Sequence, residues 1–273
     1  KRFIIVEINN HSLQLGMLQR NRLSYQNSNS GKSSVLQQLF QQKRSGESGS
    51  ANDNRSLLIH IYYFANAMQI EQNISLKQFN TFGIDVKAKQ FASFTTADEL
   101  AELLKHGNKE ELLILGGGSN ILFTKDVDGF VLKNELKGIE LINDDDDFVY
   151  VRAGAGENRH QFVLHCIQKN WGGVENLSLI PGNVGASPMQ NIGAYGVEIK
   201  EVMHTLTAFH LHDKALVHFS NNECAFGYRE SVFKRRYKNQ FVILNVTYKL
   251  KKQPQFNTSY GAINAELEAM SVK

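Results

Sequence analysis

Two glycine-rich stretches near the middle of the sequence have the composition of ligand-binding turns. The first is GGGSN at residues 116–120, which lies between two apolar runs. Glycines allow positive φ angles and let backbone amides approach a ligand without an intervening Cβ atom, and consecutive amides in such a turn form a concave site for an anion. Ile121 stands where the dinucleotide fingerprint G-x-G-x-x-G has its last glycine, so this is not that fingerprint. The stretch therefore predicts either a pyrophosphate site or a plain tight turn.

The second stretch, IPGNVGASPMQNIGAYGVE at residues 180–198, is longer and holds four glycines and two of the three prolines of the chain. A long glycine-rich loop costs conformational entropy on folding, and such loops usually have a functional reason. AGAGEN at residues 153–158 has the composition of another close-approach turn. Three such turns in one domain predict an extended cofactor with phosphate, ribose and ring contacts.

A tyrosine and an arginine stand side by side in ECAFGYRESVFK, residues 223–234. The Tyr228 hydroxyl and the Arg229 guanidinium could together bind a carboxylate or a phosphate, or stabilise an enolate. The alternative is a surface arginine beside a half-buried tyrosine.

Metal and thiol chemistry have less support in the sequence. The nine histidines show no HExxH or Cys/His ligand spacing, and His210 and His212 are two apart on an expected strand. Cys166 and Cys224 lack the spacing of a paired motif, which is typical of a reduced cytosolic protein. We therefore expect no metal site.

The elements around these motifs predict an α+β protein, because strands outnumber helices and do not alternate regularly with them. The acidic run at residues 144–147 lacks calcium-loop spacing and predicts an exposed turn between strands. Hydrophobic periodicity and turn residues predict helices over 98–107 and 159–173, a buried strand that enters the 116–120 turn, strands over 129–134, 148–156 and 241–250, and a hairpin over 206–220 that turns at residues 212–214.

The first 67 residues differ from the rest. They hold eight Lys/Arg and three acidic residues, a net charge of +5, which leaves about −2 for the remainder. Asn, Ser and Gln fill 18 of the 34 positions from 21 to 54, which predicts a disordered extension. GKSS at residues 31–34 is similar to the end of a P-loop, but Gln26 replaces the first glycine. Met68 is a possible start, and no apolar stretch reaches the length of a membrane span.

Together, these stretches resemble the UDP-N-acetylenolpyruvoylglucosamine reductase family, known as MurB. The resemblance runs from about Met68 to the C-terminus, and NIGAYGVE is similar to the first of two family types. The matching stretches are NTFGID (80–85), LILGGGSNIL (113–122), GAGEN (154–158), GGVENLSLIPGNVGASPMQNIGAYGVE (172–198) and ECAFGYRESVFK (223–234).

The resemblance implies a fold, a reaction and a location. The fold would be an FAD-binding domain of the vanillyl-alcohol-oxidase (PCMH) type over residues 68–254, with two subdomains that divide near 135–147, followed at 255–273 by the start of a substrate-binding domain. The reaction would be the NADPH-dependent reduction of UDP-N-acetylglucosamine enolpyruvate to UDP-N-acetylmuramate in peptidoglycan synthesis. We expect a cytoplasmic monomer with a nucleotide-sugar substrate and with neither nucleic-acid nor membrane partners.

The resemblance also assigns site residues. Arg229 matches the arginine that stabilises the enolate, and Tyr195, Tyr228 and Tyr260 match tyrosines on the substrate side. FAD would be held without a covalent bond by Gly116, Gly117, Gly118, Ser119, Asn120, Gly182, Asn183, Gly185, Ala186, Ser187 and Asn191.

Two departures from the family pattern affect these expectations. Arg159 stands where the family usually has a tryptophan, which predicts looser packing near the cofactor. The third family domain, with its serine proton donor and assisting glutamate, has no counterpart in this sequence, and Ser271 does not match the donor. We therefore expect impaired reduction.

Two alternatives remain: a non-catalytic FAD-binding fragment, or another flavin oxidoreductase of the same fold. Oxidases of this fold often attach the flavin through histidine or cysteine, and His160, His165 and Cys166 have no such motif.

Overall fold

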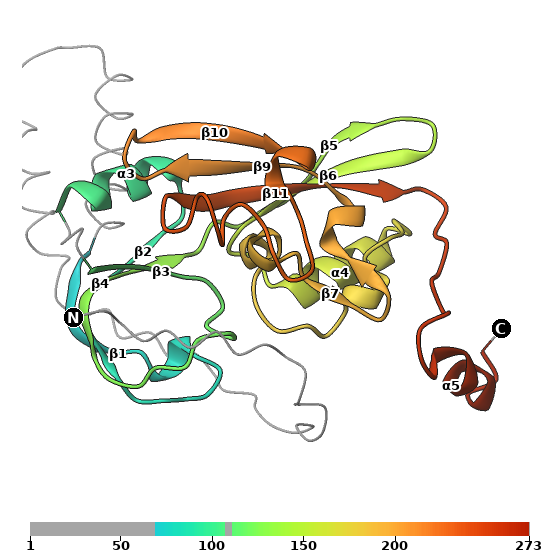
Figure 1. Cartoon of the computed structure of the whole chain (residues 1–273), viewed down its shortest axis with the longest axis horizontal. Coiled ribbons are helices and arrows are strands. Elements are labelled where there is room, and N and C mark those ends of the chain that lie inside the picture. Colours follow the sequence, from blue (N-terminus) through green and yellow to red (C-terminus); the bar gives the residue numbers. More distant parts are fainter. Residues whose placement is uncertain (1–68, 107–110, 273) are drawn as a thin grey trace, which may run out of the picture. The chain divides into compact units, whose positions relative to one another are not determined.

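The computed structural model describes residues 69–106 and 111–272 (Figure 1). The predicted N-terminal extension, with its GKSS segment and Met68, lies outside the described residues. The first sheet has the order β1-β2-β4-β3, in which β1 runs antiparallel to β2 and the other two pairings are parallel. Its strands are β1 (Glu71–Ser75), β2 (Lys87–Phe94), β3 (Leu112–Leu115) and β4 (Val127–Asn134).

Helix α3 (Ala97–His106) lies between β2 and β3 in the sequence. Its buried residues are Leu100, Leu103 and Leu104, which share one helix face. The Thr96 hydroxyl accepts a hydrogen bond from the Glu99 amide at 3.1 Å, which satisfies an N-terminal donor of the helix.

The second sheet is antiparallel throughout, in the order β10-β9-β11-β6-β5. Its strands are β5 (Ile139–Asp144), β6 (Phe148–Gly154), β9 (Met203–His210), β10 (Ala215–Ser220) and β11 (Phe241–Lys251).

The central strand β11 has apolar residues on both of its faces. Val242 and Leu244 pack with the first sheet and α3, whereas Ile243 packs on the opposite side. The register shifts between Ile243 and Asn245, and such a bulge changes which residues share a face. As a result Val246 joins Ile243 in the larger core.

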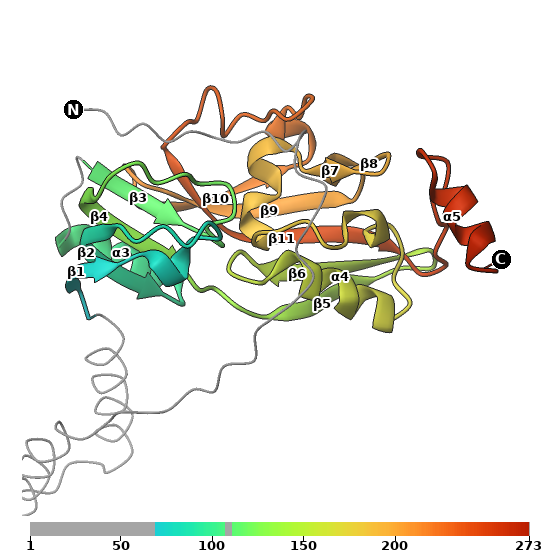
Figure 2. The same ribbon diagram turned by 90° about the horizontal axis from the view of Figure 1, so that it is seen from below.

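Two apolar cores lie on either side of β11. One joins the sheets through Phe94, Phe130 and the α3 leucines. The other lies between the second sheet and α4 (Arg159–Gln168), which contributes Phe162 and Val163 (Figure 2). Asn134 also joins the sheets, because its Nδ2 donates to the Ile243 carbonyl at 3.0 Å.

No helix in the described part of the chain is long and apolar enough to cross a membrane.

The segment between α4 and β9 contains only short elements. The short elements and the last helix are η2 (Lys77–Phe79), η4 (Glu175–Leu177), η5 (Val184–Ala186), η6 (Pro188–Gln190), β7 (Gly193–Ala194), β8 (Val197–Glu198), η7 (Ile199–Glu201), η8 (Asn222–Cys224) and α5 (Ile263–Ala269).

The main predicted elements, including the exposed acidic turn, are confirmed, with two differences. The helix predicted over 159–173 ends at Gln168, and Asn170 beyond it takes a positive φ of 58°. Strands β1, β2 and β5 were not predicted. The acidic run is an exposed turn between β5 and β6, in which Asp145 Oδ1 accepts from the Asp147 and Phe148 amides. The division near 135–147 and the further domain from 255 remain predictions.

Candidate functional site

The GGGSN turn begins directly after β3 and packs against the segment after η2. Gly118 has a φ of +64°, and a Cβ atom there would lie 2.0 Å from the Phe79 carbonyl oxygen. The Thr81 amide donates to the Gly118 carbonyl at 3.1 Å. Only glycine fits at this position, because both the φ angle and the close backbone contact exclude a side chain.

The same turn presents free backbone donors. Across residues 69–106 and 111–272, no hydrogen bond uses the N–H groups of residues 117–120 as donors. A Cβ atom on Gly116 would meet no heavy atom within 4 Å, so there is open space beside the turn. N–H groups without a protein acceptor need another partner, and in a turn that borders open space at Gly116 they could donate to an anion such as the diphosphate of FAD.

The second glycine-rich loop packs directly against this turn. A Cβ atom on Gly117 would lie 2.8 Å from Asn183 Oδ1, and one on Gly182 would lie 2.8 Å from Ser119 Oγ. Gly182 also has a φ of +108°. Glycine at both positions allows the two loops to touch, so the structure brings together the two stretches that the sequence analysis singled out.

The AGAGEN stretch is hydrogen-bonded to the second loop through backbone groups. The Gly185 amide donates to the Ala155 carbonyl at 2.9 Å, and the Val184 amide donates to the Glu157 carbonyl at 2.8 Å. A Cβ atom on Gly185 would lie 2.5 Å from Ala155 Cβ. The close approach predicted for AGAGEN is therefore an approach to the 181–187 loop.

The predicted cofactor residues divide into two groups by burial. Ser187 and Asn191 are fully buried and Asn183 nearly so, and each is hydrogen-bonded to the protein. Gly118 is buried as well. Such side chains brace the loops. The residues that keep accessible surface are Gly116, Gly117, Ser119, Asn120, Gly182, Gly185 and Ala186.

Arg159 is the most deeply buried charged residue in the described chain, at 2% exposure. Its Nε donates to Ser187 Oγ at 3.0 Å, and its two terminal nitrogens donate to the carbonyls of Pro181 and Asn183 at 3.1 and 3.2 Å. The expectation that Arg159 loosens the packing is therefore wrong, because these bonds tie it into the second loop. Burial lowers the pKa of Arg159 to about 10, so the side chain stays protonated at neutral pH.

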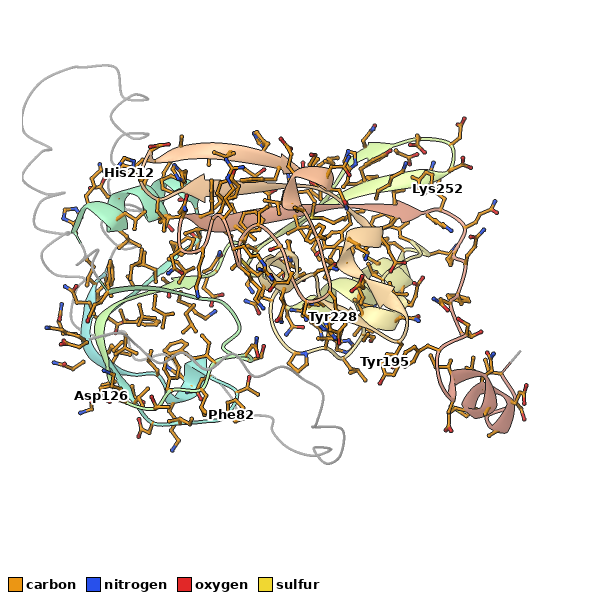
Figure 3. All side chains as sticks on the ribbon, in the orientation of Figure 1. Phe82, Asp126, Tyr195, His212, Tyr228 and Lys252 are labelled. Carbon is orange, nitrogen blue, oxygen red and sulfur yellow. The ribbon has the colours of Figure 1, made fainter. Side chains whose placement is uncertain are left out.

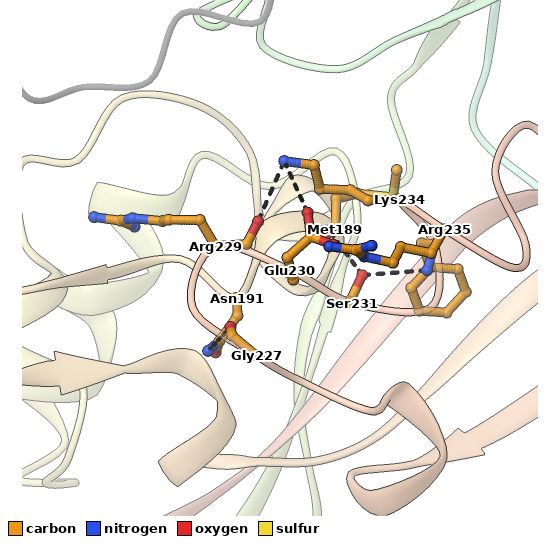
Figure 4. A network of polar contacts seen from close by, with 9 residues as sticks. Met189, Asn191, Gly227, Arg229, Glu230, Ser231, Lys234 and Arg235 are labelled. Atoms are coloured by element: carbon orange, nitrogen blue, oxygen red, sulfur yellow. Dashed lines mark hydrogen bonds and ion pairs between the residues drawn. The ribbon is translucent and has the colours of Figure 1, made fainter.

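Tyr228 and Arg229 form the tip of a tight hairpin. The Gly227 and Glu230 backbones exchange two hydrogen bonds of 3.0 and 3.2 Å, and Arg229 has a φ of 55°. Ser231 Oγ donates to the Met189 carbonyl and Asn191 Nδ2 donates to the Gly227 carbonyl (Figure 4). These two bonds attach the hairpin to the end of the glycine-rich loop.

The Arg229 guanidinium reaches the next part of that loop, where its Nη2 donates to the Gly193 carbonyl at 2.8 Å. β7 and β8 pair around Tyr195 and Gly196, which both have positive φ, as a two-residue hairpin turn requires. Tyr195 and Tyr228 are exposed and lie on the α4 side of the second sheet (Figure 3).

The Tyr195 ring meets the Tyr260 ring edge-on, with centroids 6.0 Å apart. Asn176 holds both segments by donating to the carbonyls of Tyr195 and Asn257 at 2.8 Å. The structure thus places two of the three predicted substrate tyrosines, Tyr195 and Tyr260, in contact. Arg229 bonds to Gly193, two residues before Tyr195.

The two cysteines have no role at these loops. Both are free and buried, and burial raises the pKa of each thiol to about 12, so they are poor nucleophiles at neutral pH. In the described ranges, no three His, Cys, Asp or Glu side chains are grouped as metal ligands.

Sequence reasoning missed several supporting residues. Asn80 is buried and its side chain bonds to the Leu76 and Ile84 backbones, which fixes the segment beneath Gly118. Ser231 holds the arginine hairpin. Asn80 lies in the NTFGID stretch and Ser231 in the YRES stretch, and this was the only sequence signal for either residue. Nothing in these stretches indicated that the two side chains are buried.

Comparison with known proteins agrees with this geometry. Residues 88–213 match the model of a family described as FAD binding domain. The UDP-N-acetylenolpyruvoylglucosamine reductase of Flavobacterium johnsoniae is 54% identical over 201 residues, which make up 73% of this chain and 60% of that protein. The protein of the same name from Amoebophilus asiaticus is 47% identical over 205 residues, 74% of this chain and 60% of that protein.

The chain thus spans about three fifths of the length of these relatives. The crystal structure of UDP-N-acetylenolpyruvylglucosamine reductase from Thermus caldophilus has a TM-score of 0.56 at 24% identity, and the match covers 75% of this chain and 67% of that one. The resemblance drawn from the motifs and the FAD-binding fold of the vanillyl-alcohol-oxidase type are confirmed.

Proposed function

The chain belongs, over about three quarters of its length, to the UDP-N-acetylenolpyruvoylglucosamine reductase family, and we propose that it binds FAD non-covalently at residues 116–120 and 181–187. The observation that carries this proposal is that the N–H groups of residues 117–120 donate to no acceptor among the described residues, in a turn whose Gly116 borders open space. Preorganised amides bind an anion without the cost of rearranging the turn.

The proposed reaction is the NADPH-dependent reduction of UDP-N-acetylglucosamine enolpyruvate to UDP-N-acetylmuramate, a step of peptidoglycan synthesis. FAD held at residues 116–120 and 181–187 would supply the hydride transfer from NADPH to the enolpyruvyl double bond, and a proton must also add to the neighbouring carbon to complete the reduction. The protein must then stabilise the negative charge that develops on the substrate carboxylate as an enolate.

Arg229 is suited to this role. The hairpin fixes its backbone, and its bond to the Gly193 carbonyl orients the guanidinium. A guanidinium keeps its charge at any working pH, and a positioned donor that is already in place stabilises a developing oxyanion. Tyr195, Tyr228 and Tyr260 would contact the nucleotide-sugar; the edge-on pair of Tyr195 and Tyr260 offers apolar surface with polar tips.

The remaining expectations follow from the same proposal. We propose a small-molecule substrate, a cytoplasmic location and a monomer, with no nucleic-acid or membrane partner. The residues from 255 onward would be the start of a substrate-binding domain, and the flavin domain would divide near 135–147, where the first sheet gives way to the second.

The test uses the full chain, purified without added flavin and then saturated with FAD. A visible flavin spectrum that NADPH bleaches under anaerobic conditions, and that the enolpyruvate substrate restores, would support the complete reaction. Bleaching without restoration would reduce the proposal to the NADPH half-reaction. Flavin that stays attached after acid precipitation would favour an oxidase with a covalent cofactor instead.

A paired variant tests the role of Arg229. Arg229→Gln should slow restoration of the oxidised spectrum by about 100-fold or more, while Arg236→Gln, which removes an exposed arginine from the same segment, should leave the rate unchanged. Equal rates for the two variants would contradict the assignment.

A further inference from the structure

Arg159 carries a buried charge that no acidic residue neutralises. Its guanidinium bonds only to a hydroxyl and to backbone carbonyls, and among the described residues it takes part in no ion pair. Lys133, the other buried cation of the described chain, pairs with Glu135 at 2.6 Å. A buried charge is normally paired, because removing an ion from water is costly.

The nearby titratable groups do not supply the missing negative charge. The Tyr248 hydroxyl is fully buried and forms no hydrogen bond within normal limits of distance and angle, although Ser187 lies close to it. Burial raises the pKa of Tyr248 above its ordinary value and raises that of Cys166 to about 12. Both groups are therefore neutral at neutral pH and do not offset the charge of Arg159.

This charge lies directly behind the candidate diphosphate site. A Cβ atom on Gly182 would be 3.1 Å from Arg159 Nη2 and 2.8 Å from Ser119 Oγ. The guanidinium and the Ser119 hydroxyl therefore both border the space that a side chain on Gly182 would fill, and no Gly182 side chain separates them. An anion bound at the GGGSN turn would feel the Arg159 charge across this short gap.

We propose that Arg159 is a positioning residue whose un-neutralised charge, acting across the space beside Gly182, selects a diphosphate-bearing flavin over a flavin without phosphate. This inference rests on the proposed FAD site and adds a source of selectivity to it. Arg159 also holds the Pro181 and Asn183 carbonyls toward itself, which turns these acceptors away from an anionic ligand.

The test compares three ligands that differ in phosphate number: riboflavin, FMN and FAD. Each is titrated into the full apo chain by flavin fluorescence, at low and at moderate salt. Arg159→Met removes the charge at similar length, and Arg159→Lys keeps the charge with fewer hydrogen bonds. Arg152→Met is the matched control, because Arg152 lies on the surface and pairs with Glu140 at 2.6 Å.

We expect Arg159→Met to weaken FAD binding about tenfold or more, the effect of one charge at roughly 10 Å in a protein of intermediate dielectric, while riboflavin binding changes less than about twofold. The loss of affinity for FMN should lie between the losses for FAD and for riboflavin. Arg159→Lys should keep the preference for FAD, and Arg152→Met should match the original chain for all three ligands.

Other outcomes overturn the inference. If Arg159→Met weakens all three ligands equally, Arg159 braces the loop and its charge has no role in selection. If Arg159→Met does not fold, Arg159→Lys decides: loss of the FAD preference despite a retained charge contradicts the proposal. If the original chain binds no FAD, the proposed function fails; if it binds FAD and Arg159→Met binds it equally well, only this inference fails.

Discussion

At the scale of single residues, Gly116 and Gly118 occupy one turn but differ in what a side chain would meet. Gly118 has a positive φ and lies against the Phe79 carbonyl, whereas Gly116 faces open space. Gly118→Ala should therefore lower the free energy of unfolding by about 2 kcal/mol or more, while Gly116→Ala should change it by less than about 0.5 kcal/mol.

The pair also tests where the ligand lies. Because the space beside Gly116 is the proposed cofactor space, Gly116→Ala should weaken FAD binding without a matching loss of stability. Urea unfolding and FAD titration of both variants are the measurements. If Gly116→Ala binds FAD as tightly as the original chain, the cofactor does not occupy that space.

The residue types of this site could be predicted from the sequence better than the contacts that hold them in place. Glycine spacing identified the turns, because positive φ and close approach depend on local residue type. It could not show that Ser187 and Asn191 are buried supports, since burial depends on contacts with α4 and with the 223–234 segment. For Arg159, the type of residue signalled a departure, but only the folded structure shows that its charge is buried and unpaired.

At the scale of elements, the start of α4 holds Arg159 in place. Asn158 is the N-cap, and its side-chain oxygen accepts from the Gln161 amide at 3.1 Å. Asn158→Ala should lower the free energy of unfolding by about 1 kcal/mol. Asn158→Asp keeps the acceptor and should stay within about 0.5 kcal/mol of the original chain. Equal losses in urea unfolding for the two variants would show that the cap is not the cause.

The link between the sheets depends on Asn134. Its Nδ2 donates to the Ile243 carbonyl and its Oδ1 accepts from the Leu136 amide at 3.1 Å. Asn134→Ala leaves both groups without that partner and should lower the free energy of unfolding by about 2 kcal/mol. Asn143→Ala, on the exposed strand β5, is the control and should have little effect. A small change for Asn134→Ala would mean that water replaces the lost bonds.

Strand β2 illustrates what local patterns miss at this scale. Its sequence KAKQFASF contains few strong strand formers, yet it pairs with both β1 and β4. The pairing, together with burial of Phe91 and Phe94, outweighs its weak propensity. The hairpin of β9 and β10 was predictable because its turn residues and apolar runs are adjacent in sequence.

At the scale of the whole molecule, stability should fall in alkaline solution. Burial raises the pKa of Cys166 and Cys224 from 9.0 to about 12 in the folded chain. Between these values the folded state binds more protons than the unfolded state, so the free energy of unfolding decreases as pH rises above about 9. Urea midpoints measured from pH 7.5 to 10.5 should show this decline.

A variant separates the thiols from other groups. Cys166→Ala combined with Cys224→Ala removes both titrations, so its urea midpoint should decline less steeply over the same range. Identical slopes would show that the thiols do not cause the decline, and that another group, such as Tyr248 with its raised pKa, dominates.

The α+β class was predictable because it follows from the number and order of local elements. The arrangement of two sheets around β11 was not, because the core that joins them combines β2, β4 and α3 with Phe209, Val242 and Leu244. Those residues are far apart in sequence. The two glycine loops meet only because this packing places the end of β3 beside the 181–187 segment.

The FAD site is tested most directly by an equilibrium titration of the full apo chain with FAD, followed by flavin fluorescence and by the melting temperature. We expect saturation at one FAD per chain, a rise in melting temperature with FAD concentration, and complete release of the flavin on acid precipitation. A folded chain with no saturable FAD binding and no thermal shift would contradict it, and the free amides at residues 117–120 would then need another partner.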